Sequence, residues 1–203
     1  MRVALTFDAE HGDREHSNSE GNPAMLLDAL MRRAVTATFF VQGRWASSYP
    51  ALVRRMAEAG HDVANHSDHH APMTLLTDEG VRRDVAWAEH RIEKAAGRPI
   101  DRYFRYPFGE GDSRVGEIIA GMGYQLLGWT LDPSDWDSSR IPDAAALVEW
   151  AERTRLPKDP TLILFHTWPD PTCQAIEHVI DVLRTREAEF VRVSDLGDPH
   201  SCE

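Results

Sequence analysis

Two carboxylates stand two residues apart near the start of this chain, directly after an apolar run at residues 2–7. They are Asp8 and Glu10, and in an extended strand residues i and i+2 point to the same face. Such a pair can divide the work of a hydrolytic site, one carboxylate acting as a general base and the other as a metal ligand. The alternative is a pair of solvated charges at a strand end. The abrupt change from apolar to polar sequence favours a site.

Three histidines fall within residues 66–70. His66 and His70 are four apart and would share one face of a helical turn, and His69 is an alternative ligand at the i, i+3 spacing. Two imidazoles and one carboxylate form a common ligand set for catalytic zinc. The metal would acidify a water molecule toward neutral pH. A solvated loop is the alternative, but this density of histidine favours a metal site.

A loop with a candidate role follows a short apolar run at residues 103–105. The sequence RYPFG occupies residues 105–109, and its proline and glycine favour a rigid turn. Backbone N–H groups of this turn could face a developing oxyanion, and Arg105 could hold a carboxylate in its ionised form. Alone, the motif also fits an ordinary turn with a surface arginine.

Two further motifs supply a histidine and a carboxylate. His166 ends the most apolar run of the chain, and Asp135 lies in the motif DPSDW at residues 132–136. An imidazole held by a carboxylate is suited to act as a general acid. Trp136, beside acidic residues, could form the wall of a sugar site. The alternatives are a core histidine and a turn with a packed tryptophan.

These residues share a position, because each lies at or just after the end of a strand-like run. Seven such runs alternate with helical segments, which predicts parallel strands with right-handed crossovers. The carboxyl ends of such strands form one rim, where active sites are built. Seven units could form an open doubly wound sheet or an incomplete barrel. The strands are expected at residues 2–7, 36–41, 62–65, 103–105, 124–129, 161–165 and 190–193, and the helices at 23–34, 50–59, 77–97, 113–122, 142–154 and 173–187.

Composition limits the partners of the chain. A net charge of −11 disfavours nucleic acid and anionic membranes, and no apolar run approaches the ~20 residues of a membrane span. Cys173 and Cys202 have neither the spacing of metal ligands nor the number of a disulfide framework. Since the first strand begins almost at Met1, we expect no secretory signal and a cytoplasmic location, unless the chain is a trimmed secreted form. The oligomeric state stays open.

Taken together, five motifs resemble those of the polysaccharide deacetylase family, the NodB-homology domains of carbohydrate esterase family four. In order, they are TFDAE (6–10), HSDHH (66–70), RYPFG (105–109), DPSDW (132–136) and LILFH (162–166). The resemblance covers residues 1–195 and implies one NodB-homology deacetylase domain there, followed by a polar tail at residues 196–203. It implies an α/β fold, a distorted (β/α)7 barrel, and removal of acetyl groups from sugars.

The resemblance also implies roles for single residues. His66 and His70 would bind a divalent metal, most often zinc, with cobalt or nickel as alternatives. The family usually has a second aspartate directly after the base as the third ligand; that position is Ala9 here, and Glu10 is the candidate replacement. The remaining roles are Asp8 as general base, Arg105 holding this base, the Phe108 N–H binding the oxyanion, His166 as general acid tethered by Asp135, and Tyr106 and Trp136 binding substrate.

The sequence therefore predicts a metal-dependent deacetylase of an N-acetylated amino sugar or glycoconjugate, acting on a small-molecule or oligosaccharide substrate. Two alternatives stay open. The altered first motif is compatible with a hydrolase of the same fold acting on another linear or cyclic amide. Ala9 in place of the usual carboxylate is compatible with a catalytically silent carbohydrate-binding module.

Overall fold

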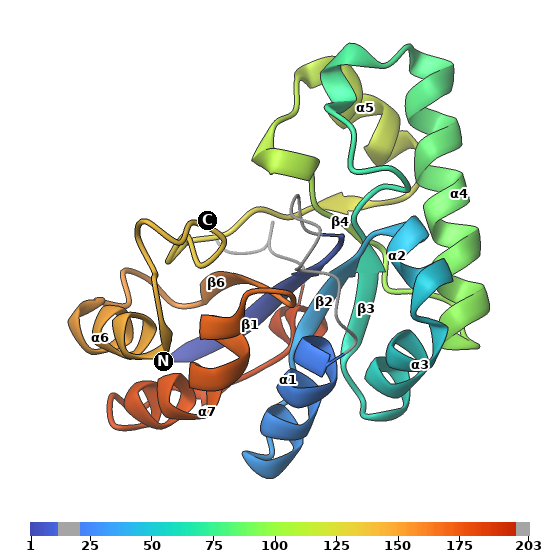
Figure 1. The fold of residues 1–203 in the computed structure, drawn as a ribbon. Coiled ribbons are helices and arrows are strands. Elements are labelled where there is room, and N and C mark those ends of the chain that lie inside the picture. Colours follow the sequence, from blue (N-terminus) through green and yellow to red (C-terminus); the bar gives the residue numbers. More distant parts are fainter. Residues whose placement is uncertain (12–20, 198–203) are drawn as a thin grey trace.

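The computed structural model describes residues 1–11 and 21–197, in which seven strands form one parallel sheet (Figure 1). The strands are β1 (Arg2–Ala9), β2 (Thr38–Val41), β3 (Asp62–Asn65), β4 (Tyr103–Phe104), β5 (Gln125–Leu126), β6 (Thr161–His166) and β7 (Glu189–Phe190). The α-helices are α1 (Gly21–Arg32), α2 (Gly43–Ser48), α3 (Pro50–Glu58), α4 (Asp78–Ala96), α5 (Ser113–Gly121), α6 (Ala144–Arg153) and α7 (Asp170–Arg184). Short 3-10 helices are η1 (Met73–Leu75), η2 (Pro107–Gly109) and η3 (Val193–Leu196).

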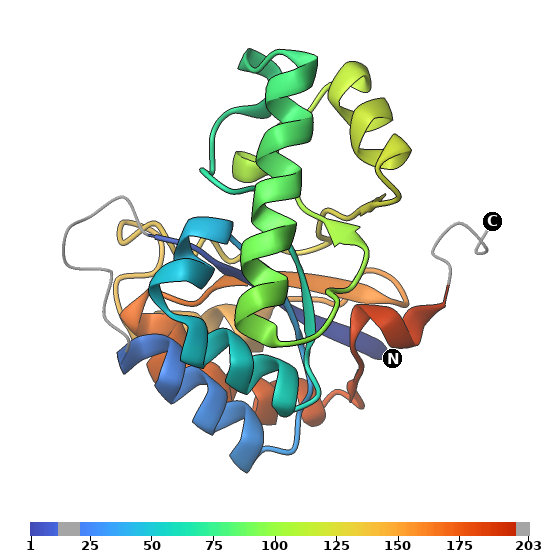
Figure 2. The ribbon, with the colours of Figure 1, turned by 90° about the vertical axis from the view of Figure 1, so that its right-hand side faces the viewer.

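The sheet has the order β5-β4-β3-β2-β1-β6, and β7 pairs with the first residues of β1. The chain that leaves β5 returns to β6, where Leu131 forms a parallel bridge with Ile163. This return curls the sheet, and the helices pack around its outside (Figures 1 and 2). The predicted distorted barrel is therefore confirmed, in preference to an open doubly wound sheet with helices on both faces.

Strand β1 shows how the sequence separates core from site. Alternate residues point to opposite faces of a strand. The odd-numbered residues join the hydrophobic core between the sheet and the helices, and Phe7 stacks on Phe39 and Phe165 at ring distances of 5.2 and 5.7 Å. The even-numbered residues face the interior of the barrel, so that Asp8 and Glu10 emerge together at its upper end, as predicted.

Helix ends follow the expected capping chemistry, with shifts of a few residues. Thr77 caps α4 by accepting the Gly80 N–H at 3.1 Å, and Gly97 ends that helix with a left-handed φ of 72°. The caps of α5 and α6 are Asp112 and Asp143, whose carboxylates accept backbone N–H groups at 2.8 and 2.9 Å. The helix expected from residue 113 thus begins there, whereas the one expected from residue 142 begins two residues later, at Ala144.

The structure differs from the predicted local structure in three places. Helix α2 was not predicted, because its six residues are too few for a periodic pattern to show. The predicted strand at residues 124–129 has only two paired residues, Gln125 and Leu126. Residues 66–70 do not form a helical turn, since Ser67 and His70 have positive φ values of 64° and 54°.

Other expectations fall partly outside the described residues. In the described part of the chain, no helix is long and apolar enough to cross a membrane. Cys173 is a buried free thiol, while Cys202 and most of the predicted tail lie outside the described residues. Residues 12–20, which precede the first helix, also lie outside them, and α1 begins at Gly21, two residues before the expected start at residue 23.

Candidate active site

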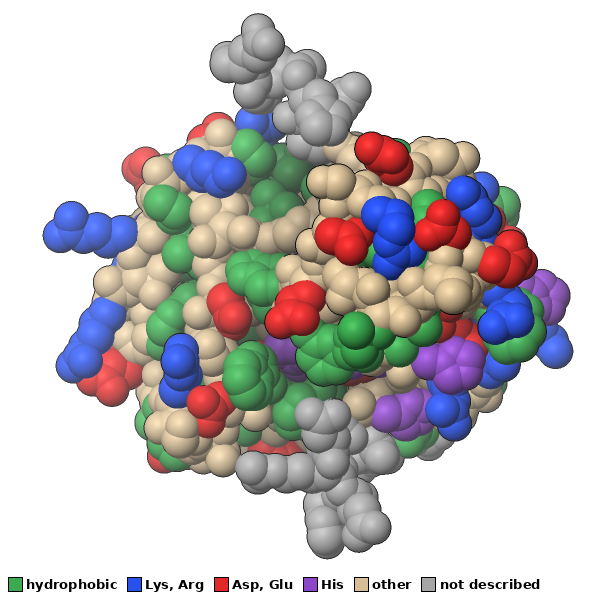
Figure 3. Space-filling model, turned by 90° about the horizontal axis from the view of Figure 1, so that it is seen from above, with side chains coloured by type: hydrophobic (Ala, Val, Ile, Leu, Met, Phe, Trp, Pro, Cys, Tyr) green, Lys and Arg blue, Asp and Glu red, His purple; other side chains and the backbone are tan. Residues whose placement is uncertain are grey.

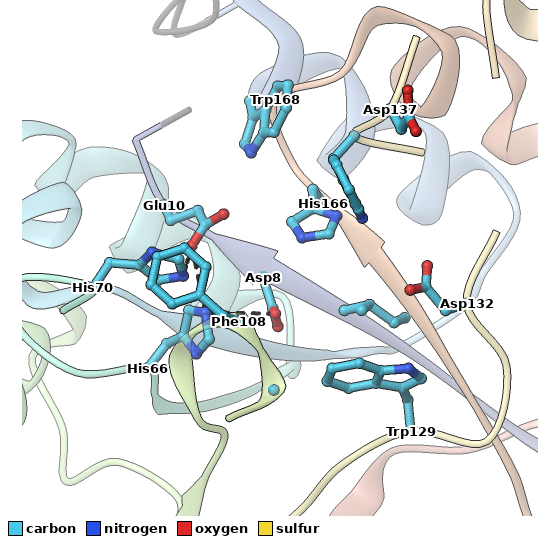
Figure 4. Close-up of a pocket in the computed structure, with 13 residues that line it drawn as sticks. Asp8, Glu10, His66, His70, Phe108, Trp129, Asp132, Asp137, His166 and Trp168 are labelled. Atoms are coloured by element: carbon cyan, nitrogen blue, oxygen red, sulfur yellow. Dashed lines mark ion pairs between the residues drawn. The ribbon is translucent and has the colours of Figure 1, made fainter. Parts of the chain in front are cut away.

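A cavity of about 510 Å³ opens at the carboxyl ends of β1, β3 and β6 (Figure 4). Seen from above, hydrophobic and acidic side chains border a hollow in which histidine is visible (Figure 3). The lining residues are Asp8, Glu10, His66, His70, Phe108, Gly109, Trp129, Asp132, Trp136, Asp137, Leu164, His166 and Trp168. Six of the predicted site residues and the aromatic Trp136 thus meet in one cavity, at the rim that the alternation of strands and helices predicts.

Glu10, His66 and His70 form a cluster suited to a metal ion. Their ligand atoms all lie within 4.8 Å of one another. The Oε2 atom of Glu10 is 2.6 Å from His70 Nε2 and 3.4 Å from His66 Nε2. That oxygen is buried and meets the geometry of no hydrogen bond, so its pairing is incomplete unless a cation joins the group. One carboxylate and two imidazoles are a typical catalytic zinc set.

The second nitrogen of His66 supports this assignment. Its Nδ1 lies 2.9 Å from the Arg105 carbonyl oxygen, which can only accept, so Nδ1 carries the proton. Nε2 therefore faces the cluster, where loss of its proton to the solvent would present a lone pair to a metal, the arrangement usual for metal-bound histidine. Burial raises the pKa of Glu10, but His66 and His70 outweigh burial and hold that pKa far below its usual range. Glu10 is therefore an anionic ligand at neutral pH.

The loop that carries the histidines is held by side chains from three directions. Asn65 Oδ1 accepts the Ser67 N–H at 2.9 Å, and Ser67 Oγ accepts the His70 N–H at 2.8 Å. Asp84 of α4 accepts the backbone N–H groups of Asp68 and His69, at 2.9 and 3.2 Å. These bonds stabilise the two residues with positive φ and bring His66 and His70 together without a helix.

His69, the alternative ligand, is turned away from the cluster. Its Nδ1 lies 3.1 Å from Asp84 Oδ2 and 3.2 Å from Asp68 Oδ2, and its side chain is half exposed. Among the described residues, the metal-type cluster contains His66 and His70 but not His69. The structure thus decides between two spacings that the sequence left open.

Asp8 is held by a fully buried arginine. Arg105 Nη1 donates to Asp8 Oδ1 at 2.7 Å, while Nη2 donates to Thr6 Oγ1 at 2.8 Å and to the Gly128 carbonyl at 3.0 Å. The guanidinium also lies 4.0 Å from the centre of the Phe40 ring. Burial lowers the pKa of Arg105, and Asp8 opposes that effect. The second oxygen of Asp8 stays directed at the cavity, 3.5 Å from His66 Nε2.

His166 and Asp135 form the pair that the sequence predicts. Asp135 Oδ1 lies 2.7 Å from His166 Nδ1, and its Oδ2 accepts the His166 backbone N–H at 2.9 Å and the Thr172 hydroxyl at 2.5 Å. Burial lowers the pKa of His166, but Asp135, aided by Asp8 and Glu10, outweighs it and raises the pKa to about 9. His166 pairs in register with Asp8 on the next strand, so the candidate acid and the candidate base stand side by side.

The aromatic predictions separate in the structure. Trp136 is half exposed and lines the cavity, whereas Tyr106 does not: its ring packs on Phe104 at 5.8 Å and against Gly111. A Cβ at Gly111 would lie 2.4 Å from the Tyr106 ring, so this contact requires glycine. Phe108 has a positive φ of 58°, and its ring covers His70 at 4.4 Å.

Sequence reasoning missed several residues of the site. Thr172 and Asp84 come from helices and touch the site through long-range contacts that leave no local pattern. Trp168 and Trp129 line the cavity. Their position just after strand-like runs could have indicated them, since that is the position used to find His166.

The model of the polysaccharide deacetylase family matches residues 1–127. The chain belongs to this family. It is 31% identical over 197 residues to a chitooligosaccharide deacetylase of Sinorhizobium fredii, covering 91% of this chain and 86% of that protein. It is 26% identical over 194 residues to the peptidoglycan-N-acetylmuramic acid deacetylase PdaA of Bacillus subtilis, covering 96% and 70%.

A solved structure agrees with the sequence comparisons. A family 4 carbohydrate esterase from Streptomyces lividans, in complex with acetate, superposes on this deacetylase with a TM-score of 0.81 at 30% identity, covering 96% of this chain and 94% of that one. These findings confirm the predicted family, the NodB-type barrel and the class of enzyme, a deacetylase that hydrolyses carbon–nitrogen bonds. Deacetylases of this family are metal-dependent, and the cluster of Glu10, His66 and His70 is a possible metal site.

Proposed function

We propose that this protein removes the acetyl group from an N-acetylated amino sugar within an oligosaccharide or glycan, with zinc held by Glu10, His66 and His70. One observation carries the proposal: this cluster, Asp8 and His166 line the same cavity, while the buried Arg105 and Asp135 hold Asp8 and His166 from behind. Two relatives named for deacetylation of chitooligosaccharide and of peptidoglycan N-acetylmuramic acid support a sugar substrate.

The zinc proposal rests on the donor set. Nitrogen and oxygen ligands in a group of three suit a catalytic zinc site, which keeps a position open for water or substrate. A divalent ion held there would polarise the acetyl carbonyl and make water more acidic. Cobalt or nickel would accept the same ligands, and metal analysis of the purified protein distinguishes them.

The residues around the cluster divide the proton transfers. Asp8, whose Oδ1 is held by Arg105, accepts a proton from the attacking water at its second oxygen, Oδ2. The Phe108 N–H is the candidate donor to the oxyanion, since the η2 turn borders the cavity beside His70. Leu164 and Trp136 supply apolar wall for the acetyl methyl group and the sugar ring.

His166 favours an amide over an ester substrate. Its Nδ1–H is held by Asp135, and a pKa of about 9 keeps the ring protonated at neutral pH, so that Nε2 can donate a proton. An amine leaves only when its nitrogen is protonated, whereas an alcohol leaves far more readily. The raised pKa is therefore matched to N-deacetylation.

The test measures acetate release from a panel of N-acetylated amino-sugar oligosaccharides and O-acetylated sugars, and ring opening of simple cyclic imides in a parallel assay. We expect acetate from N-acetylated sugars by the zinc-loaded protein, and loss of about 10²–10⁴-fold in kcat with Asp8→Asn or His166→Gln. Absence of acetate from every N-acetylated sugar would reject the proposal. Preferential hydrolysis of the imides would replace it with the second hydrolase considered above.

A further inference from the structure

A second cavity adjoins the active site on the side of His70. It has a volume of about 370 Å³ and shares His70 and Phe108 with the main cavity. Its lining residues are His11, Gln42, Arg44, Ser48, His69, His70 and Phe108. None of these described residues is a carboxylate, although the whole chain carries a net charge of −11. The described lining of this side cavity therefore has no negatively charged side chain, in contrast to the acidic chain as a whole.

Arg44 is the cationic residue of the side cavity. It is exposed, and within the described ranges no carboxylate forms an ion pair with its guanidinium. The carboxylate that acts on it is Asp68, which is fully buried behind the cavity and already pairs with Arg91 Nε at 3.2 Å and with His69 Nδ1 at 3.2 Å. The charge of Arg44 is thus left available to a ligand.

The position of Arg44 relative to the metal cluster is fixed by the backbone. The Gly43 N–H donates to the Ser67 carbonyl at 2.9 Å, and the Arg44 N–H donates to the Asp68 carbonyl at 3.3 Å. A Cβ at Gly43 would lie 2.7 Å from the Ala88 Cα, so glycine allows this close approach. Helix α2 therefore moves together with the histidine loop, and Arg44 stays beside the site.

Of the neighbouring histidines, His69 pairs with carboxylates that do not line the side cavity, and His11 contacts a neutral amide. His69 Nδ1 faces Asp84 and Asp68 behind it, and His11 Nδ1 faces Gln42 Oε1 at 3.0 Å. At the opposite end of the active site, beyond His166, the main cavity is lined by the carboxylates of two further residues, Asp132 and Asp137. Asp132 and Asp137 lie on the side of His166 away from Glu10 and His70 (Figure 4), so the combined cleft has an acidic end there and a basic end at Arg44.

We propose that the side cavity binds an anionic substituent of the sugar substrate, a carboxylate or a phosphate, through Arg44. This inference rests on the proposed function and specifies its substrate class. Arginine suits this role because its planar guanidinium presents paired N–H donors that match both groups. The acidic end of the cleft would repel the same substituent, so the charge pattern also orients the glycan.

The test compares ligands that differ only in charge. An N-acetylglucosamine oligosaccharide carrying a carboxylate substituent, its neutral carboxamide and its phosphate analogue are titrated calorimetrically into the zinc-loaded protein. Wild type should bind the carboxylate about tenfold more tightly than the carboxamide. Arg44→Gln should reduce this preference to about twofold or less, and Arg82→Gln, which removes an equal charge at an exposed position of α4, should retain it.

The Arg82→Gln control separates a contact with Arg44 from the loss of one positive charge, and a carboxylate that binds zinc directly would keep its preference in Arg44→Gln. Equal affinities for the carboxylate and the carboxamide in wild type, or a full preference retained in Arg44→Gln, would overturn the inference. The affinities of the carboxylate and phosphate ligands are compared, and the ligand with the higher affinity indicates which of the two anions the side cavity prefers. Acetate release from the neutral ligand is recorded separately and tests the proposed function, so the two proposals can fail independently.

Discussion

Replacing Asp135 with asparagine should move the alkaline limit of activity. Asp135 holds the protonated form of His166 through the 2.7 Å contact with Nδ1, and it is the largest of the influences that raise this pKa to about 9. Asparagine keeps the shape and the acceptor for the Thr172 hydroxyl but removes the charge. Without that charge, burial lowers the His166 pKa toward or below its ordinary value of 6.5.

The size of the effect follows from the two pKa values. With a pKa of about 9, roughly 90% of His166 is protonated at pH 8, whereas a pKa of 6.5 leaves roughly 3%. The variant should therefore lose about 30-fold in kcat/KM at pH 8 from protonation alone, and much less at pH 6. The rise from 6.5 to about 9 also corresponds to about 3 kcal/mol favouring the imidazolium in the folded protein.

The same change should alter stability with a defined sign. Because the folded pKa of His166 lies above the unfolded value, its contribution is complete below about pH 6.5 and is lost as the pH rises through about 9. Asp135→Asn should thus destabilise the protein more at pH 6 than at pH 9.5, as measured by urea unfolding. The assay for activity is the kcat/KM profile for acetate release between pH 5 and 10.

Asp137→Asn is the matched control, because it removes an equal charge from the same cavity, whereas the Nδ1 and the backbone N–H of His166 are both held by Asp135. It should leave the alkaline limb near its wild-type position. If the Asp135→Asn profile keeps an alkaline limb near pH 9 and only falls in height, then Asp135 does not set the protonation of His166, and the reasoning is refuted.

Three further results follow from described contacts. Glu10→Gln should weaken zinc binding by at least about 10²-fold, since even residues behind a ligand cost 10–100-fold; unchanged zinc content after dialysis would exclude Glu10 as a ligand. Arg105→Met should lower the free energy of unfolding, measured by urea titration, by about 3–5 kcal/mol, because the buried Asp8 loses its arginine partner. Adding Asp8→Asn to this variant should restore part of the lost free energy. His61 is buried and accepts the Ala37 N–H at 3.0 Å, and burial lowers its pKa to about 4. The free energy of unfolding should therefore fall by about 3 kcal/mol as the pH drops from 6.5 to 4, because the unfolded chain takes up a proton that folded His61 resists. In a His61→Gln variant, the free energy of unfolding should fall less over that range.

The sequence predicted the strand ends well because parallel strands with crossover helices leave a strong pattern. Buried strands such as β6 are continuous apolar runs, and the polar residues that follow them must lie on one rim. It predicted β5 poorly, since a two-residue strand depends on its partner Phe104 and not on its own propensity.

The candidate site was predictable as a set of residue types but not as a geometry. The spacing of His66 and His70 suggested a helical turn, whereas the loop reaches the same convergence with positive φ at Ser67 and His70. Those conformations depend on backbone N–H groups of the loop that donate to Asn65 and Asp84. Asp84 belongs to a helix that begins only at residue 78. Such contacts are set by packing, which a single sequence does not display.

The even-odd alternation of β1 has a consequence for how such an enzyme can change over evolutionary time. Ala9 lies in the hydrophobic core, fully buried on the face opposite Asp8 and Glu10. An aspartate at that position would not join the site; its charge would be trapped between the sheet and the helices. One substitution at position 9 would therefore not place a carboxylate in the site of this chain, because the end of the strand would also have to change conformation to turn that side chain inward.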